Sequence, residues 1–391
     1  MTETEAPLIF LVAGEPSGDQ LGAHLMAALT AETGGRIRFA GVGGPRMEAE
    51  GLRSLFPMSD LTVMGLVEVL PHLRRLLRRM SETEAAARRL RPSLLVTIDS
   101  PAFSLRVAKR LKGAGFPLVH YVAPSVWAWK PWRARKVAAF LDHLLALLPF
   151  EPPYFEAHGL ATTVVGHPAV EMAADPAAGA AFRAARAVEE RAPLLAVLPG
   201  SRRSEVTRLS GIFGDTLALL KRDFPHLRAV VPTVPNVSAL VRAAAAAWPV
   251  ETLVLEEPPE KYAAFAAADA ALAASGTVAV ELAVARVPTV VAYRVSPITA
   301  AIARRMLKVR YASLPNLVLD REVQPEFLQE NCRADRLAPA VADFLSGREL
   351  RRRQTRDLDL VVAALSGAGT GAPSRQAARA VLQVVAETGR S

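Results

Sequence analysis

Residues 8–25 read LIFLVAGEPSGDQLGAHL, an apolar run followed by a glycine-containing turn and an amphipathic stretch. An apolar run without alternation is typical of a strand that is buried on both faces of a parallel sheet. The sequence therefore predicts a strand that ends at Ala13 and a helix that begins near Asp19. Gly14 and Gly18 permit a tight turn with exposed backbone N–H groups, which together with a helix N-terminus can bind an anion or a hydroxyl group. A plain turn between strand and helix fits the same residues about equally well.

The same unit recurs along the chain, because apolar runs that end in Gly, Asp, Pro or Ser alternate with longer amphipathic stretches. This alternation predicts repeated βαβ units and an α/β fold with parallel sheets. An Ala- and Pro-rich stretch at 168–192 divides the units into two groups, and a helix over 178–190 opens the second. We therefore expect two doubly wound Rossmann-like domains facing a cleft, at 1–167 and 168–345, and a charged helical tail at 346–391. The runs in which these strands are predicted, each with its terminating residues, are 8–14, 36–43, 94–99, 118–124, 194–200, 228–234, 251–256, 269–275 and 288–294.

Composition restricts the class of protein. The chain has 391 residues, of which 51% are hydrophobic and 22% are charged, and these values are typical of a globular protein. A single cysteine, Cys332, excludes a disulfide framework and a thiolate metal site, and it fits a reducing cytosol. No uncharged apolar run reaches the ~18 residues of a membrane span, so we expect that the chain does not cross a membrane. The formal net charge is +9, which favours an anionic partner: nucleic acid, phospholipid or a phosphorylated substrate.

Much of that charge lies in and after residues 63–80, VMGLVEVLPHLRRLLRRM. On a helical wheel the leucines and Met80 fall on one side and the arginines, including Arg79, on the other. Two interpretations are open: a core helix with a solvated basic face, or an amphipathic helix at the surface of an anionic membrane. Pro71 breaks a continuous helix, so a second helical piece is expected to begin near it. The membrane interpretation assigns lipid contacts to Leu66, Leu70, Leu73, Leu77, Arg74, Arg75 and Arg78.

Candidate chemistry in the first half follows two predicted strands. Asp99, in LLVTIDSPAF, follows an apolar run, so its carboxylate is expected at the carboxyl end of a strand, where it could take a proton from a hydroxyl group. The alternative is a cap or turn at a helix start. The stretch 120–137, HYVAPSVWAWKPWRARKV, places three Trp beside four cations. This combination suits sugar faces, bases or lipid headgroups, or a loop packed under a domain interface.

Two strand ends in the second half have the composition of phosphate sites. Ser201 and Arg202 follow the run that ends in Pro-Gly, and a guanidinium beside helix N–H groups suits a diphosphate. Ser275, Gly276 and Thr277 form a second such turn. Glu281 lies one turn further along the same helix face, where it can accept two hydrogen bonds from a ribose. Ordinary turns would explain each motif alone, but two in one half favour a nucleotide.

We expect no metal site. The aspartates of DLD at 357–359 match a metal signature, but they lie in the helical tail and not at a strand end. The seven histidines show no ligand spacing; His24, His120 and His167 have the character of loop or core residues.

Taken in order, eight motifs resemble those of the lipid-A-disaccharide synthase family along nearly the whole chain: VAGEPSGDQLGA, GVGGPRM, VMGLVEVL, HYVAPSVWAW, VGHP, LPGSRRSEV, ASGTVAVELA and LPNLVLDREVQPEFLQENC. The resemblance implies a GT-B fold and a bacterial, inverting transferase that needs neither a metal nor a cofactor. It implies UDP-2,3-diacylglucosamine as donor and 2,3-diacylglucosamine 1-phosphate (lipid X) as acceptor. The implied products are the β-1,6-linked disaccharide 1-phosphate and UDP.

The resemblance also implies roles for single residues. Asp99 matches the essential acidic residue, and Glu15 and Ser17 match the N-terminal loop. The implied donor site consists of Ser201, Arg202, Ser275, Gly276, Thr277, Glu281, Asn316, Glu326 and Gln329. The chain departs from the family at Asp320, where Gly is frequent, and at Gln324, where an apolar residue is more frequent, so the contacts of that loop are open.

Both implied substrates carry acyl chains, so the chain is expected in the cytoplasm, peripheral on the inner face of the inner membrane and in contact with its anionic surface. No nucleic-acid partner is expected, and a homodimer is left open. A GT-B transferase with a polyprenyl-linked acceptor is the nearest alternative. A soluble UDP-sugar epimerase would explain the nucleotide motifs but not the Leu/Arg stripe or the Trp cluster. A nucleic-acid binder would not need Asp99, Glu281 and two phosphate turns.

Overall fold

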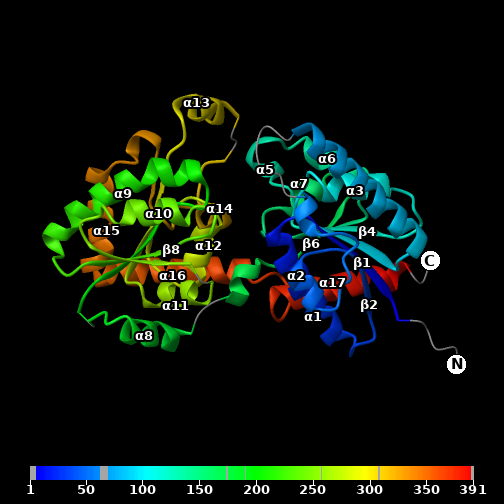
Figure 1. Cartoon of the computed structure of the whole chain (residues 1–391), viewed down its shortest axis with the longest axis horizontal. Helices are drawn as coiled ribbons and strands as arrows, with labels where there is room; N and C mark the ends of the chain where they lie inside the picture. The colour runs from blue at the N-terminus through cyan, green and yellow to red at the C-terminus, as the bar shows by residue number, and fades with distance from the viewer. Residues whose placement is uncertain are drawn as a thin grey trace. The chain divides into compact units, whose positions relative to one another are not determined.

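The computed structural model describes residues 6–61, 69–172, 175–189, 191–256, 258–306 and 309–388. The chain divides into two compact units, Met1–Pro168 with Leu365–Ser391, and Ala169–Ala364. Each unit contains a six-stranded parallel sheet with helices, so the predicted α/β class with two Rossmann-like units is confirmed (Figure 1).

The first unit is built around the sheet β2-β1-β3-β4-β5-β6. Chain order reverses between β1 and β3, which pair in parallel with Val12 opposite Thr97 and Ala13 opposite Ile98. In open parallel sheets, ligands bind beyond the carboxyl ends of the strands at such a switch point. The elements of the first unit are β1 (Leu8–Ala13), α1 (Pro16–Glu32), β2 (Arg38–Val42), α2 (Pro45–Ala49), η1 (Met58–Leu61), α3 (Val69–Leu90), β3 (Leu94–Ile98), α4 (Ser104–Arg110), β4 (Leu118–Tyr121), α5 (Val126–Trp129), α6 (Arg133–Ala138), β5 (His143–Ala146), α7 (Pro152–Glu156), β6 (Ala161–Val164) and α17 (Pro373–Thr388).

The second unit has the strand order β12-β11-β10-β7-β8-β9. Numbered within the unit this is the 3-2-1-4-5-6 order of dinucleotide-binding sheets, and its switch point lies between β7 and β10. Its elements are η2 (Pro168–Met172), α8 (Pro176–Ala185), β7 (Leu194–Leu198), α9 (Arg203–Asp223), β8 (Arg228–Pro232), α10 (Ser238–Ala245), β9 (Glu251–Leu255), α11 (Pro258–Ala267), β10 (Ala270–Ala274), α12 (Thr277–Val284), β11 (Thr289–Tyr293), α13 (Pro297–Met306), α14 (Leu314–Leu319), β12 (Glu326–Leu328), η3 (Gln329–Asn331), α15 (Ala334–Ser346) and α16 (Arg348–Leu365).

The C-terminal stretch 346–391, expected as a separate tail, is divided between the two units. α16 belongs to the second unit, whereas α17 packs against α1 in the first, where Figure 1 shows it in red. Val381 and Val384 are buried in one core cluster with Ile9 of β1. An amphipathic helix is stabilised by burying its apolar stripe, and this surface of the first unit provides that burial.

All nine predicted strands are present, with boundaries that differ by one to three residues. α1 begins at Pro16 rather than near Asp19, because a proline fits the first helical position, where no N–H partner is needed. The helix that opens the second unit ends at Ala185, and Ala187 beyond it has a left-handed φ of 48°. The sequence prediction missed β5, β6 and β12.

Candidate active site

The switch point of the first unit brings Ser17 and Asp99 together. Ser17 lies in the first turn of α1, and its hydroxyl donates a hydrogen bond to Asp99 Oδ2 at 3.1 Å. Asp99 follows β3, and its backbone N–H donates to the carbonyl of Tyr121 on β4 at 2.9 Å. Asp99 and Ser100 both have a φ of 45°, a left-handed conformation that non-glycine residues adopt at a cost. The neighbouring strand and helix therefore hold the carboxylate of Asp99 in a fixed place at the sheet edge.

Glu15 and Gly14 complete this turn. Glu15 is the residue before α1; its side chain is exposed, and its carbonyl accepts the N–H of Asp19 at 2.9 Å. A Cβ atom on Gly14 would lie 2.9 Å from Ser100 Oγ, so a side chain there would press on the residue that follows Asp99. Gly14 thus permits the close approach of the two strand ends.

Asp19 has a structural role that the sequence did not reveal. It is 3% exposed, and its carboxylate accepts N–H groups from Gly44, Arg46 and Met47 at 2.8 to 3.1 Å. This buried carboxylate accepts N–H groups at the start of α2 that have no partner within the helix, and it holds α2 against α1.

The Trp cluster divides into one anchored ring and two exposed rings. Trp127 Nε1 donates to Glu151 Oε1 at 3.2 Å, whereas Trp129 is 40% and Trp132 56% exposed. Lys130 lies over the ring of Trp129, with Nζ 3.9 Å from the centroid. Glu151 also accepts the N–H groups of the residues at 147 and 148, and burial raises the pKa of its carboxyl group to about 7. The exposed rings and their cations remain accessible to a ligand.

His120 is not suited to act as a base. It is fully buried in β4, and burial lowers the pKa of its imidazole to about 3. Its Nδ1 lies 2.8 Å from the hydroxyl of Thr97 on the adjacent strand. Burial likewise lowers the pKa of His167 to about 4.

A cavity of about 440 Å³ lies at the switch point of the second unit. It adjoins the carboxyl ends of β7, β8 and β10, so the two phosphate turns predicted from the sequence face one space. The lining residues are Leu198, Gly200, Ser201, Arg202, Glu205, Pro232, Thr233, Val234, Lys261, Ala274, Ser275, Gly276, Thr277, Val278, Glu281 and Leu314.

Arg202 is positioned by Glu205, which the sequence analysis did not single out. Glu205 lies in the first turn of α9 and accepts the N–H groups of Ser201 and Arg202 at 3.1 and 3.2 Å. It also accepts one N–H of the Arg202 guanidinium at 3.2 Å, while the side chain of Arg202 stays 76% exposed. A glutamate at the third helical position is a known helix-start signal, so the sequence contained this cue. The hydroxyl of Tyr293 lies 3.3 Å from the same carboxylate.

The second turn presents the start of α12 to the cavity. Thr277 is the first residue of the helix, and the hydroxyl of Ser275 donates to the carbonyl of Ala312 at 2.8 Å. The N-terminus of a helix attracts anions through its free N–H groups and its dipole. Glu281 lies one turn further on, as predicted, but both its carboxylate oxygens contact Lys261, another residue the sequence analysis did not identify.

Asn316, Glu326 and Gln329 organise the neighbouring loop, and they are not among the cavity's lining residues. Asn316 is buried and donates to Glu326 at 2.7 Å, while Glu326 accepts the N–H groups at 312 and 313. Gln329 accepts the N–H at 295 at 3.4 Å. This network fixes the loop that contains Leu314, which lines the cavity, so these residues stabilise the cavity wall without contacting the cavity.

The structure describes the surroundings of both residues at which a departure from the family pattern was expected, Asp320 and Gln324. Asp320 ends α14 with a left-handed φ of 49°, a conformation that glycine adopts without cost. Gln324 is fully buried; it accepts the hydroxyl of Ser313 at 2.7 Å and donates to the carbonyl of Ala279 at 3.2 Å. Its amide is therefore hydrogen-bonded at a site where an apolar side chain would need no partner.

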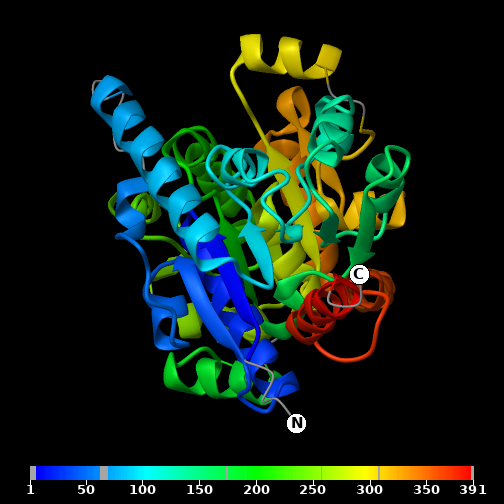
Figure 2. The same cartoon turned by 90° about the vertical axis from the view of Figure 1, so that its right-hand side faces the viewer.

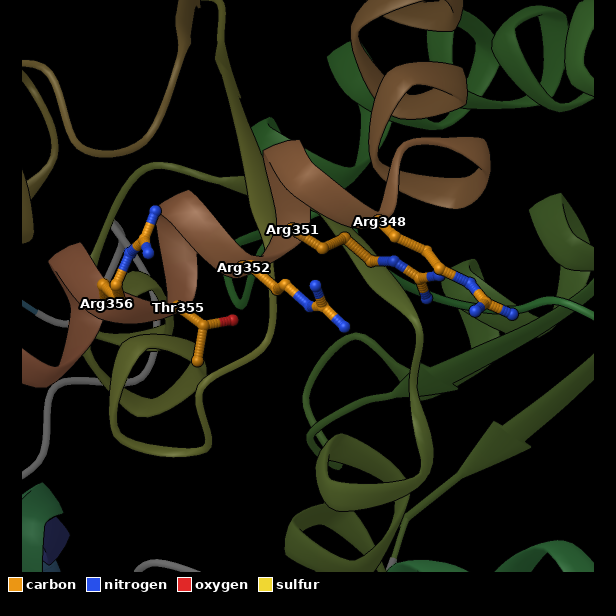
Figure 3. A pocket seen from close by; sticks show the side chains of 5 residues that line it. All are labelled: Arg348, Arg351, Arg352, Thr355 and Arg356. Atoms are coloured by element: carbon orange, nitrogen blue, oxygen red, sulfur yellow. The ribbon is translucent and has the colours of Figure 1, made fainter.

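A second cavity, of about 580 Å³, lies elsewhere in the same unit (Figure 3). Gln354 of α16 binds the backbone of Thr289, the first residue of β11, so this cavity is at the amino ends of the strands. Its place and its cationic lining separate it from the site at the carboxyl ends. All its lining residues come from α16: Arg348, Arg351, Arg352, Thr355 and Arg356.

The arginine-rich segment forms α3, which begins at Val69 and so has Pro71 in its first turn, as expected. Figure 2 shows α3 as the long light-blue helix whose first turns extend beyond the sheet of its unit. Leu73 and Leu77 are each 43% exposed. Arg74, Arg75 and Arg78 are exposed as well; Leu66 and the side chain of Leu70 lie outside the described residues.

The predicted stripe on α3 is not uniform. Met80 is buried in the core of the first unit and Leu76 packs against it. Arg79, expected on the solvated face, is mostly buried, pairs with Asp60 at 2.5 Å and lies over the ring of Phe56. The helix thus turns one edge to the core and leaves Leu73 and Leu77 in solvent beside the remaining arginines.

None of the helices in the described ranges has both the length and the apolar character that crossing a bilayer requires. Within the same ranges, no group of three or more His, Cys, Asp and Glu side chains is arranged to hold a metal ion.

Similarity to known proteins extends over nearly the whole chain. A family model described as Lipid-A-disaccharide synthetase matches residues 9–381. A lipid-A-disaccharide synthase of Rhodospirillum centenum is 56% identical over 380 residues, which cover 97% of this chain and 94% of that protein. One of Paramagnetospirillum magneticum is 50% identical over 382 residues, covering 97% of each.

Solved structures show the same fold at low identity. A UDP-GlcNAc 2-epimerase from Neisseria meningitidis bound to UDP-GlcNAc matches with a TM-score of 0.64 at 10% identity, covering 97% of this chain and all of that one. MurG of Acinetobacter baumannii matches with a TM-score of 0.54 at 13% identity, covering 97% and 99%. Together with the two six-stranded parallel sheets of this chain, this likeness in fold confirms the expected GT-B fold class.

Proposed function

Because the chain belongs to the lipid-A-disaccharide synthetase family, we propose that its two switch points divide one reaction between them. The site in the first unit activates the acceptor, and the cavity in the second unit binds the UDP-sugar. The chain is an enzyme, an inverting glycosyltransferase of lipid A biosynthesis. It joins UDP-2,3-diacylglucosamine to 2,3-diacylglucosamine 1-phosphate and releases the β-1,6-linked disaccharide 1-phosphate and UDP.

Asp99 acts as the general base for the acceptor hydroxyl. A primary sugar hydroxyl is a poor nucleophile, so a positioned base accelerates its attack by about 10²–10⁴-fold. Oδ2 of Asp99 accepts the Ser17 hydroxyl, which leaves Oδ1 to accept the proton of the substrate. Ser17 positions the carboxylate, and Glu15 lies on the same turn, where it can bind a hydroxyl of the incoming sugar.

The second unit stabilises the departing UDP. Negative charge develops on the β-phosphate as the glycosidic bond breaks, and fixed donors aimed at that charge lower the barrier. The N-termini of α9 and α12 and the exposed guanidinium of Arg202 supply those donors. Glu281 accepts the ribose hydroxyls. Asn316, Glu326 and Gln329 hold the loop that closes the site.

One observation carries this proposal: both phosphate turns and Glu281 line one cavity of about 440 Å³ at the β7–β10 switch point. The test is mass spectrometry of purified protein incubated with UDP-2,3-diacylglucosamine and lipid X. A disaccharide 1-phosphate formed with one UDP per turnover is the expected result. An epimerised UDP-sugar without transfer would refute the proposal in favour of a UDP-sugar epimerase. Transfer to a polyprenyl-linked acceptor only would refute it in favour of a transferase with that acceptor.

The exposed apolar strip of α3 is proposed to contact the membrane that holds both acylated substrates. Leu73 and Leu77 lie beside Arg74 and Arg78 on exposed parts of the helix. Partial insertion of apolar side chains combined with arginine attraction to anionic lipid gives reversible binding. The membrane that we propose it contacts is the inner membrane, at its inner face, where UDP-sugars and lipid X meet.

A further inference from the structure

Lys261 covers the carboxylate of Glu281. Its Nζ lies 2.7 Å from Oε1 and 2.6 Å from Oε2, so the ammonium group bridges both oxygens. The hydroxyl of Tyr262 also donates to Oε1 at 3.2 Å. A vicinal diol that binds a carboxylate through both hydroxyls needs the same two oxygens. Lys261 and a ribose therefore compete for one position.

The ammonium group of Lys261 could also pair with an anion bound elsewhere in the same cavity. Lys261 lines it together with Arg202 and the turn 275–277, the part of the cavity suited to phosphates. Its side chain is 28% exposed and has a flexible four-carbon stem, so it can reorient without movement of the backbone. An anion bound at the turn would attract an ammonium group that a ribose has displaced from Glu281.

We propose that Lys261 is a specificity-determining residue. Its ammonium group leaves the carboxylate of Glu281 free for a ribose only when a phosphate of the same ligand pairs with that ammonium group. The site thereby discriminates nucleoside diphosphates from nucleosides. This inference rests on the proposed function, because it takes Glu281 as the ribose acceptor. A bound UDP exchanges one ion pair for another, whereas a bound uridine leaves the ammonium group without a counterion.

The alternative is a purely structural tether. Lys261 lies on α11 and Glu281 on α12, so their ion pair joins two helices. A tether predicts that loss of Lys261 disorders Glu281 and weakens every uridine ligand alike. The two interpretations therefore predict opposite changes in the affinity for uridine.

The test is calorimetric titration of the full chain with uridine, UMP and UDP. In Lys261→Met, uridine is expected to bind more tightly, and the ratio of the uridine to the UDP dissociation constant is expected to fall at least about tenfold, as for loss of one hydrogen bond to a charged group. Lys261→Arg should keep the wild-type ratio. Lys221→Met removes an exposed lysine that contacts the carbonyl of Pro249, and it should change neither affinity.

Equal weakening of uridine and UDP in Lys261→Met, or an unchanged ratio, would overturn the inference. If the Met variant does not fold, Lys261→Gln keeps the length and polarity of the side chain and the same comparison applies. Tyr262→Phe removes an uncharged contact to Glu281, so it should affect uridine and UDP equally and leave the ratio of their dissociation constants unchanged. Failure of the wild-type protein to bind UDP would instead refute the proposed function.

Discussion

The hydroxyl of Ser17 donates to the carboxylate of Asp99 at 3.1 Å, although the two residues are 82 positions apart in the sequence. β1 and β3 are adjacent and parallel, so the turn after β1 and the end of β3 meet at one sheet edge. The hydrogen bond occupies one carboxylate oxygen and orients the other. This arrangement gives Asp99 the fixed geometry that a general base requires.

Replacing Asp99 with Asn should lower turnover by about 10²–10⁴-fold, because an amide keeps the volume but cannot accept a proton. UDP affinity should change little, since the proposed UDP site lies in the other unit. Rates at saturating substrate and calorimetric UDP titration test both statements. Asp215→Asn, an exposed change on α9, is the control. Near-normal turnover would assign the base to Glu15 or His24.

Replacing Arg202 with Ala should weaken UDP binding, because the side chain is an exposed cation that lines the cavity at the α9 N-terminus. A loss of about 1.5–3 kcal/mol is expected for a hydrogen bond to a charged group. Glu205→Gln should have a smaller effect in the same direction, since Glu205 orients Arg202. Arg208→Ala is the matched control, because Arg208 lies on α9 six residues after Arg202 and outside the cavity lining. If all three substitutions weakened UDP binding equally, the proposed contact between Arg202 and UDP would be contradicted.

Replacing Leu73 and Leu77 together with Ser should weaken binding to anionic vesicles and leave the melting temperature almost unchanged. Burial of one apolar side chain is worth up to about 1.5–3 kcal/mol, so two partly inserted leucines contribute measurably. Met80→Ser on the same helix is the opposite control, because Met80 is 1% exposed and its loss should destabilise the fold. Vesicle sedimentation and thermal unfolding measure the two effects. A sharp drop in the melting temperature of the double variant would remove the membrane interpretation.

Glu151 should make stability depend on pH. Burial raises the pKa of its carboxyl group from 4.5 to about 7, so the folded protein binds a proton that the unfolded chain releases. The contribution is fully present below about pH 4.5 and is lost as pH rises through 7. The free energy of unfolding should therefore fall with pH more steeply in the wild type than in Glu151→Gln, by about 3 kcal/mol in total. Parallel pH profiles from denaturant titration would refute this assignment.

Transferase activity should survive EDTA. In the proposed site, Arg202 and two helix N-termini would provide the positive charge that a divalent cation otherwise supplies to a leaving diphosphate. The measurement is UDP release before and after chelation, with a Mg²⁺-dependent transferase as the positive control. Activity that is lost with EDTA and restored by Mg²⁺ would refute a metal-independent mechanism.

The sequence by itself predicted nine of the twelve strands in the described residues and the strand ends at which the candidate site residues lie. Apolar runs ended by Gly, Asp, Pro or Ser are local signals, so all nine predicted strands are present. Because parallel sheets place chemistry at the carboxyl ends of their strands, Asp99, Arg202 and Thr277 could be singled out without a structure. Glu281 followed from the helix spacing of four residues.

Tertiary structure decided the partners of those residues. β5, β6 and β12 are short, and their few residues have no pattern that separates a strand from a helix or loop; they exist because a neighbouring strand pairs with them. α17 joins a unit whose first strand begins more than 360 residues earlier, because its valines complete the core around Ile9.

The same distinction applies to single side chains. Leu76 and Leu77 are adjacent in the sequence, yet one packs against the core and the other is exposed, because only the position of α3 against its sheet decides which edge is covered. Lys261 meets Glu281 across two helices, so no local pattern indicated the pair. Backbone geometry depends on near neighbours and can be predicted from them, whereas burial and ion pairing depend on which distant elements the folded sheet brings together.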